Sequence, residues 1–250
     1  MGRQRTPEGP PPAPAVQKLR IRYAKRGRLR FSSTRDFSRA LERALRRAGV
    51  PMAYSAGFHP HPKISYANGA QTGAASEAEY FEISTTVRVD PDKVRAALDA
   101  ALPDGLDIVE VVEAQPGALA DRLQASTWRV EFRTEEPGVV AAAVEALMSA
   151  ERAEVTRTFK SGPKTFDVRA AVLSADVSGA TDPVYAIMHM VVRHTTPAVR
   201  PDDVLTALRA VAHFEPLTPP LVTRLSQGPW DDARARVADP LAADEAVAGT

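Results

Sequence analysis

The hydrophobic and polar positions in the first half of the chain predict alternating strands and helices. Residues 19–23 alternate at period two, as a half-buried strand does, and residues 29–31 continue that strand beyond a turn. Apolar residues from Phe37 to Ala48 recur at helical spacing, and Gly49 ends this helix. The pattern then predicts an extended segment at 52–67, a strand at 80–89, a helix from 91 to 102 and a strand at 106–112.

The second half repeats this order. It predicts a strand at 128–132, a helix at 139–148, a long strand or hairpin at 153–172, a strand at 185–192, a helix at 201–212 and a strand at 214–224. Two β-α-β-β-α-β runs favour an α+β fold with two tandem ferredoxin-like domains, 17–113 and 125–227, each an antiparallel sheet with helices on one face. We expect a disordered proline-rich leader at 1–16 and a disordered acidic tail at 228–250.

Composition narrows the class of protein. The 250 residues are 44% hydrophobic, which is enough to bury a core. The chain has no cysteine, which excludes disulfides, thiolate zinc sites, iron–sulfur clusters and a cysteine nucleophile of its own. We therefore expect no cofactor held by this chain. Since no apolar stretch reaches about 20 residues and the polar start is no signal peptide, we expect a cytoplasmic protein without membrane contact.

Charge is distributed unevenly along the chain. Residues 17–63 hold 13 Lys or Arg and two acidic residues, a net +11, whereas residues 64–250 carry 17 basic and 28 acidic residues, a net −11. Such a basic region attracts polyanions, most often nucleic acid. Because the chain has 26 Arg and only 6 Lys, a GC-rich coding bias could also account for some of this arginine.

The first predicted helix concentrates this charge. Its apolar stripe leaves a row of arginines, spaced three or four apart, on the opposite face: Arg35, Arg39, Arg43, and Arg46 or Arg47. Such a row is suited to phosphates, although a solvated arginine face is an equal alternative. Ser33 and Asp36 form a capping-box pattern at the start of this helix, and a helix N-terminus also favours an anion.

The segment from Tyr54 to Tyr66 combines histidines, aromatic residues and prolines. A metal pair of His59 and His61 is conceivable, but no carboxylate or third histidine follows nearby, so we expect no metal site. Other interpretations are a histidine acid–base on RNA, stacking and phosphate contact, or a silent packed loop. Residues 68–79 are small and flexible, and the chain has neither P-loop nor dinucleotide-binding spacing.

These patterns give two sets of candidate residues. The catalytic candidates are His61 and Asp36. The predicted nucleic-acid contacts are Arg20, Arg22, Lys25, Arg28, Arg30, Arg39, Arg43, Arg46, Phe58, His59, His61, Lys63 and Tyr66.

The motifs at 28–31, 39–49, 54–65 and 76–80, together with Asp36 and Gly73, resemble the radical-SAM-associated domain of unknown function. The resemblance spans about residues 17–224. That domain is often fused behind a radical SAM protein, and the present chain resembles its free-standing actinobacterial form, which is encoded beside a ribonuclease E/G family enzyme. The resemblance implies a context in RNA metabolism and no reaction. The chain departs from the usual Ser-His-x-Asp at residues 33–36, and relatives often carry asparagine at the position of His59.

Three functional hypotheses follow. The first is a non-catalytic RNA-binding or adapter module that grips phosphates through its basic first domain. The second is an RNA-processing or RNA-modifying enzyme that uses the cleft between the domains, with His61 and Asp36 as acid and base. The third is an interaction subunit whose basic helix docks on an acidic radical SAM or ribonuclease E/G partner.

Overall fold

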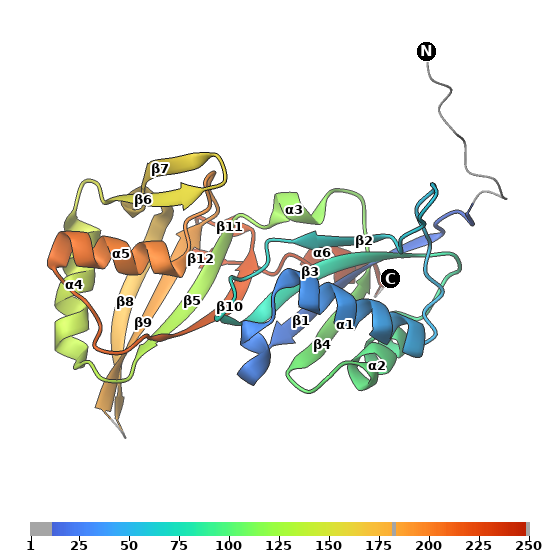
Figure 1. The fold of residues 1–250 in the computed structure, drawn as a ribbon, viewed down its shortest axis with the longest axis horizontal. Coiled ribbons are helices and arrows are strands. Elements are labelled where there is room, and N and C mark those ends of the chain that lie inside the picture. Colours follow the sequence, from blue (N-terminus) through green and yellow to red (C-terminus); the bar gives the residue numbers. More distant parts are fainter. Residues whose placement is uncertain (1–11, 182–183, 249–250) are drawn as a thin grey trace, which may run out of the picture. The chain divides into compact units, whose positions relative to one another are not determined.

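A computed structural model describes residues 12–181 and 184–248 (Figure 1). The fold is a mixed α+β fold: six α-helices, two 3-10 helices and twelve strands are present in these ranges. The described chain forms two units. Unit 1 contains residues 12–72, 78–120 and 241–248, and unit 2 contains residues 73–77, 121–181 and 184–240.

Unit 1 is built on a sheet with the strand order β4-β1-β3-β2. Its elements follow the predicted order, with one added 3-10 helix: β1 (Gln17–Lys25), η1 (Gly27–Phe31), α1 (Thr34–Arg47), β2 (Ile64–Ala67), β3 (Ala75–Thr85), α2 (Pro91–Ala101) and β4 (Leu106–Glu113). The pairs β1–β4 and β2–β3 are antiparallel.

The first strand is shorter than the alternation predicts. Residues 29–31 were expected to extend β1, but they belong to η1. Gly27 has a φ of 53°, a left-handed conformation that stops the extended chain there. The Leu29 N–H then donates to the Arg26 carbonyl at 3.0 Å and closes a turn. Phe31 therefore leaves the sheet and lies on the surface with 59% of its area exposed.

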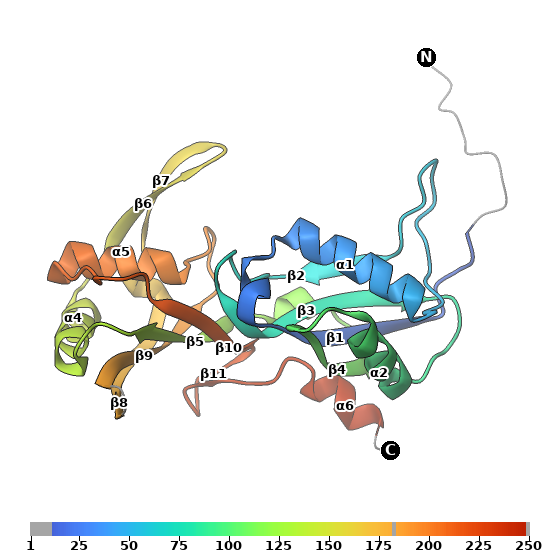
Figure 2. The same ribbon diagram turned by 60° about the horizontal axis from the view of Figure 1, so that its bottom comes forward.

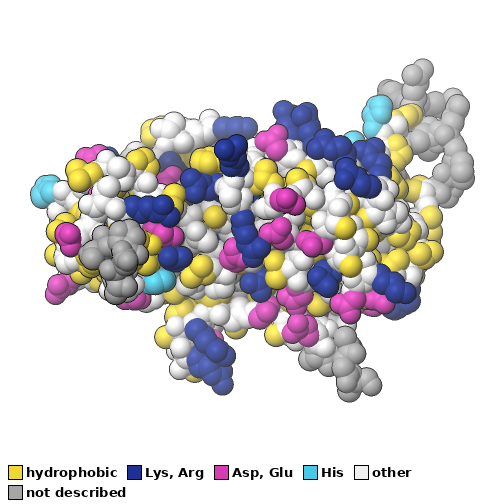
Figure 3. Space-filling view, turned by 90° about the horizontal axis from the view of Figure 1, so that it is seen from below, with side chains coloured by type: hydrophobic (Ala, Val, Ile, Leu, Met, Phe, Trp, Pro, Cys, Tyr) yellow, Lys and Arg dark blue, Asp and Glu magenta, His cyan; other side chains and the backbone are white. Residues whose placement is uncertain are grey.

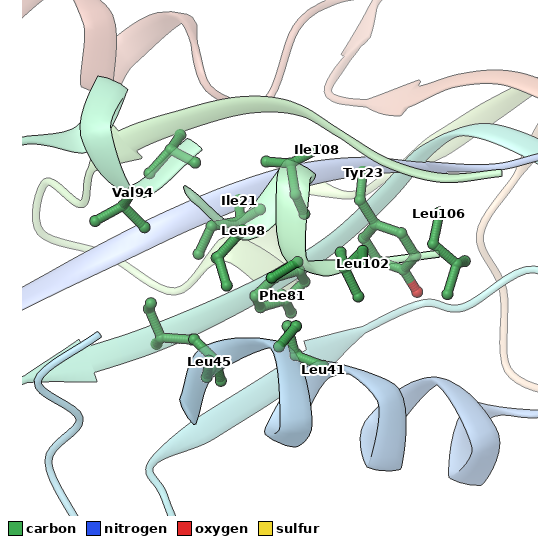
Figure 4. Close-up of a cluster of buried hydrophobic side chains, with 14 of the residues drawn as sticks. Ile21, Tyr23, Leu41, Leu45, Phe81, Val94, Leu98, Leu102, Leu106 and Ile108 are labelled. Carbon is green, nitrogen blue, oxygen red and sulfur yellow. The ribbon is translucent and has the colours of Figure 1, made fainter. Parts of the chain in front are cut away.

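The core of unit 1 lies between the sheet and two helices (Figure 4). Alternate residues of β1, Leu19 and Ile21, meet Leu41 and Leu45 of α1 and Leu98 of α2. Each of these five side chains is at most 2% exposed. Burial of one such side chain stabilises a fold by roughly 1.5–3 kcal/mol, so this cluster fixes α1 against the sheet.

The intervening residue of β1 points to the other face of the sheet. The Arg20 guanidinium lies 2.9 Å from a Glu82 oxygen of β3 and 2.7 Å from a carboxylate oxygen of Asp244. Asp244 belongs to α6 (Ala242–Ala248), which returns to unit 1 from the end of the chain. Leu241, just before this helix, is fully buried. Residues 241–248 are thus packed onto unit 1.

Unit 2 has the strand order β10-β5-β9-β8, with each neighbouring pair antiparallel. The first residues of β3, Ala75 and Ser76, add to its β10 edge by parallel pairing with Thr223 and Arg224. The elements of the unit are β5 (Ala125–Phe132), α4 (Pro137–Ser149), β6 (Glu154–Phe159), β7 (Gly162–Asp167), η2 (Arg169–Ala171), β8 (Val172–Thr181), β9 (Val184–Arg193), α5 (Pro201–Ala212) and β10 (Leu221–Gly228).

The second strand of this sheet differs from the sequence prediction. The expected strand or hairpin at 153–172 forms β6 and β7, which pair as a separate two-stranded sheet with a turn before Gly162. The strand that pairs with β9 is β8, over residues 172–181. Its small and polar residues lack the clear alternation that marks a strand, which is why the pattern misses it.

The predictions of disorder at the two ends of the chain have different outcomes. Of the predicted leader, residues 1–11 lie outside the described residues, and residues 12–16 form no helix or strand. The predicted loose tail instead contains β11 (Trp230–Asp231), β12 (Arg236–Val237) and α6. The sixth helix of the described chain is the short α3 (Leu119–Arg122). None of the described helices is long and apolar enough to cross a membrane.

Candidate nucleic-acid interface

Helix α1 is positioned by a cap and by its apolar stripe. The Ser33 hydroxyl accepts a hydrogen bond from the Asp36 N–H at 3.2 Å, and an Asp36 carboxylate oxygen accepts from the Ser33 N–H at 3.1 Å. This confirms the predicted capping box. The hydrogen bonds from the Ser33 hydroxyl and N–H hold the pKa of the Asp36 carboxyl below its ordinary value. Asp36 is thus fixed as a helix cap.

The outer face of α1 carries a row of five arginines, which we call the α1 arginine row: Arg35, Arg39, Arg43, Arg46 and Arg47. All five are exposed, and Lys and Arg side chains gather over α1 on the face drawn in Figure 3. The Arg46 side chain donates to the Glu42 carbonyl at 3.2 Å. Among the residues that the structure describes, none of the five forms an ion pair with a carboxylate. The row is therefore an accessible line of positive charge.

The segment between α1 and β2 forms an exposed loop, residues 53–63, here called the recognition loop. Backbone hydrogen bonds close it, from the Ser55 N–H to the His61 carbonyl and from the Lys63 N–H to the Ala53 carbonyl, both at 2.8 Å. Its tip holds Phe58, which is 61% exposed, beside the exposed His59. The loop projects beyond the strands of unit 1 (Figure 2). Its side chains are available for contact with a ligand.

Tyr66 connects the strand after this loop to α1. Its hydroxyl donates to the Ser38 Oγ at 3.0 Å, and its ring meets the Phe37 ring edge-on with centroids 6.0 Å apart. Burial raises the pKa of the Tyr66 hydroxyl. With 38% of its area exposed, Tyr66 still presents part of its ring to solvent. Of the predicted aromatic contacts, Tyr66 is therefore the more fixed and Phe58 the more exposed.

An aromatic residue that the prediction omitted lies just before α1. The exposed Phe31 of η1 is covered by the Arg30 guanidinium, 4.8 Å above its ring. Arg28 of the same 3-10 helix is exposed. The signal for Phe31 was weak because its alternation with Leu29 indicated a strand. An arginine on an exposed ring is a common element of surfaces on which bases stack.

Two predicted phosphate contacts are inside the protein. Arg20 is 1% exposed, and its guanidinium is occupied by Glu82, Asp244 and the Gly117 carbonyl. Lys25 is 5% exposed. Neither side chain can reach a phosphate on the surface, so both are removed from the predicted interface. Burial follows from their place on β1, where both faces of the strand are covered.

The other predicted basic contacts have different exposures. Arg22 and Arg30 are partly buried, and Arg28, Arg39, Arg43, Arg46 and Lys63 are exposed. The catalytic candidates gain no geometric support, because Asp36 is bound to Ser33 and its lowered pKa disfavours proton transfer near neutral pH. The His61 side chain is exposed, and the backbone N–H of His61 donates to the Ser55 Oγ at 3.0 Å.

The described residues were also expected to hold no metal centre. In the described ranges, no three His, Cys, Asp or Glu side chains lie close enough together to hold a metal ion. His59 and His61 thus have no third ligand there.

Comparison with known proteins identifies the family of the chain but assigns it no activity. No curated protein matches the chain. A family model described as "Uncharacterized protein conserved in bacteria (DUF2344)" matches residues 18–201, which include α1, the recognition loop and most of unit 2. Because this match covers well over half of the 250 residues, the chain belongs to the DUF2344 family of bacterial proteins.

Proposed function

We propose that the chain is a cytoplasmic RNA-binding module that grips phosphates through the α1 arginine row and contacts bases or ribose through the recognition loop. The observation that carries this proposal is the exposure of five arginines on one helix face, none of which pairs with a carboxylate of the described chain. Like charges at this spacing repel one another by a few tenths of a kcal/mol per pair on an isolated helix. A polyanion relieves that repulsion and releases its condensed counterions.

The α1 arginine row and the exposed aromatic rings would contact different parts of the RNA. Arginines at three- and four-residue spacing on a rigid helix suit a phosphate backbone, which fixes the position of the nucleic acid. Exposed rings such as Phe58 and Phe31 suit the stacking of unpaired bases, and unpaired bases are the usual targets of sequence-specific RNA recognition. RNA is favoured over duplex DNA for this reason.

We also propose a tandem ferredoxin-like architecture as the scaffold. In each unit the strand order, with the hairpin β6–β7 counted as an insertion in unit 2, agrees with a split βαβ arrangement. The resemblance to the radical-SAM-associated domain supports a role in RNA processing or modification. A radical SAM protein or a ribonuclease E/G family enzyme would then be the partner that carries the chemistry.

Fluorescence anisotropy with tRNA and rRNA fragments tests the proposal. Contact with about four phosphates predicts that the logarithm of the affinity falls with the logarithm of salt at a slope of about −3. A poly-glutamate competitor distinguishes RNA from an acidic protein surface. Weaker binding to the RNA fragments than to poly-glutamate, or no loss of RNA affinity at higher salt, would contradict the proposal.

A further inference from the structure

The β6–β7 hairpin of unit 2 forms a two-stranded ribbon of its own. Six residue pairs join its strands, from Glu154 with Asp167 at the base to Phe159 with Gly162 at the turn. The hairpin extends away from α5 (Figure 2). Because a two-stranded hairpin is only marginally stable by itself, one that projects from a fold needs contacts that hold it in place.

Such contacts are present at the base of the hairpin. Val155 and Val168 are buried there. The Arg157 guanidinium donates to the Asp203 carboxylate of α5 and, at 2.9 Å, to the Ala198 carbonyl. Since Asp203 is only 4% exposed, this ion pair is largely shielded from solvent. Arg157 therefore holds the hairpin against α5, and its charge is neutralised within the fold.

Two phenylalanine rings lie on the same side of the ribbon as Arg157. Arg157 pairs directly with Lys164, and residues paired in this way point to the same side. Phe159 and Phe166 each lie two positions further along their strands and share that side. The Arg157 guanidinium carbon is 4.6 Å from the centroid of the Phe159 ring and 5.2 Å from that of Phe166. Both rings are partly exposed, so Arg157 orients them at the surface.

The tip of the ribbon carries positive charge that the fold leaves uncompensated. Residues 155–166 contain three cationic residues and no Asp or Glu, and Asp203 neutralises one of the three, Arg157. The other two, Lys160 and Lys164, are exposed, and neither forms an ion pair with a carboxylate of the described chain. The Lys164 Nζ lies 5.7 Å from the centroid of the Phe159 ring. Two free ammonium groups thus lie next to partly exposed aromatic rings.

We propose that the β6–β7 hairpin is a second RNA contact of this protein, in which Lys160 and Lys164 bind phosphates of a single strand and a base packs against Phe159 or Phe166. Cations beside aromatic rings are typical of surfaces that bind single-stranded nucleic acid, because every base has a face that can stack. An RNA duplex fits less well, since its bases are stacked inside and its major groove is too narrow for side chains. An acidic peptide would neutralise the lysines but offers no base to the rings.

This inference deepens the proposed function and rests on it, because it assumes single-stranded RNA as the ligand. The α1 arginine row belongs to unit 1, whereas the hairpin belongs to unit 2. Substitutions can therefore alter one surface without changing the residues of the other.

A salt series with a short oligouridine tests the phosphate contacts. Lys160→Gln/Lys164→Gln should make the slope of the logarithm of affinity against the logarithm of salt shallower by about 1.4, at about 0.7 per phosphate of a single strand. The matched control is Arg209→Gln/Arg234→Gln, which also removes two exposed cations from unit 2 and leaves the hairpin intact. The control should keep the wild-type slope. Equal slopes for the two double variants would overturn the proposal.

Photo-crosslinking tests the contact with a base. Oligouridine that carries 5-iodouridine should crosslink to the peptide containing Phe159 or Phe166, as identified by mass spectrometry. Phe159→Leu removes the ring and should lower the affinity by about fivefold, the lower end of what one stacked base contributes, without changing the salt slope. The lysine variant keeps the test valid if Phe159→Leu unfolds the hairpin. Crosslinks confined to unit 1 would contradict the proposal.

The outcomes separate this proposal from the proposed function. A slope that responds to Arg39→Gln/Arg43→Gln but not to the hairpin lysines would overturn the hairpin contact and leave the α1 contact in place, and the opposite response would overturn α1 alone. The absence of any RNA binding would overturn both. Poly-glutamate binding that depends on Lys160 and Lys164 as strongly as RNA binding does would overturn RNA as the ligand of the hairpin.

Discussion

Strand β1 and helix α1 carry arginines only fifteen residues apart, yet these arginines differ in burial and in ion pairing. Arg20 on β1 is buried and is held by Glu82 and Asp244. Arg35 on α1 is exposed and makes no ion pair with the described residues. The same residue type thus stabilises the fold in one place and remains available to a ligand in the other.

This difference shows which of the basic residues in a positively charged stretch of sequence end up on the protein surface. Strand alternation turns Arg20 toward the second face of the sheet, and α6 covers that face from 224 positions along the chain. The capping box and the apolar stripe turn the other arginines outward. Local patterns therefore predict the exposed row, but they contain no information about a distant segment that neutralises a strand residue.

The largest expected effect on the free energy of unfolding comes from replacing the buried arginine, Arg20. Arg20→Met removes the buried guanidinium that pairs with Glu82 and Asp244, and removing one member of a buried ion pair costs about 3–5 kcal/mol. Urea unfolding measures the free energy of unfolding. The control is Arg88→Met, whose exposed pair with Glu113 contributes at most about 1 kcal/mol. Equal effects of the two substitutions would contradict the role assigned to Arg20.

A partly buried histidine in unit 2, His194, extends the comparison to a base whose uncharged form is favoured. The His194 Nδ1 donates to the Leu123 carbonyl and its Nε2 accepts from the Ser126 hydroxyl, both at 2.7 Å. Burial lowers the pKa of His194 below its ordinary value of 6.5, and the positive charge of Arg224 adds to this effect.

The pH dependence of stability follows from that direction. The unfolded chain binds a proton at His194 near pH 6.5, and the folded protein binds it only at lower pH, so stability is greatest above pH 6.5 and falls as the pH decreases. The slope is at most about 1.4 kcal/mol per pH unit. Thermal unfolding from pH 7.5 to 5.5 should show this decline in wild type and a smaller one in His194→Gln. Identical profiles would refute the assignment.

A smaller effect tests the cap that orients the arginine row. Ser33→Ala removes the hydroxyl that accepts from the Asp36 N–H, and loss of an N-cap costs about 1 kcal/mol. The pKa of Asp36 should also rise toward its ordinary value, because the Ser33 hydrogen bonds are the main cause of its lowering. Carboxyl NMR titration measures this shift. An unchanged Asp36 pKa would show that the capping box is not its cause.

The smallest expected effect on the free energy of unfolding comes from replacing exposed arginines of α1. Arg39→Gln combined with Arg43→Gln should change the free energy of unfolding by less than about 0.5 kcal/mol, because exposed side chains contribute little and the loss of like-charge repulsion offsets what they do contribute. Urea unfolding checks this value. A loss above about 1 kcal/mol would mean that these arginines have partners within the fold.

Sequence patterns predicted most of unit 1 and part of its candidate interface. Helix α1, its cap and its exposed arginines follow from local periodicity, which needs no distant contact. The pattern failed at residues 29–31, where Gly27 breaks the strand, and at β8, whose small polar residues hide the alternation. The expected loose tail is folded, because Leu241 anchors α6 although its surroundings are acidic and rich in alanine.

The burial of Lys25 and Glu79 had a local signal that the charge pattern concealed. Lys25 continues the apolar row of β1 and Glu79 that of β3, so both were predictable as residues facing the helices. Counting Lys25 among surface cations ignored this register. Only the pairing of β1 with β3 brings the two charges to the same end of the sheet, and a single sequence does not specify strand neighbours.

The most direct test of the account compares two double variants that remove the same charge from different helices. Arg39→Gln/Arg43→Gln alters the α1 arginine row, and Lys93→Gln/Arg95→Gln removes two exposed cations from α2. RNA affinity measured across a salt series should show a slope shallower by about 1.4 for the α1 variant, corresponding to two lost phosphate contacts, and an unchanged slope for the α2 variant. Equal slopes for the two variants would contradict the claim that α1 binds the phosphates.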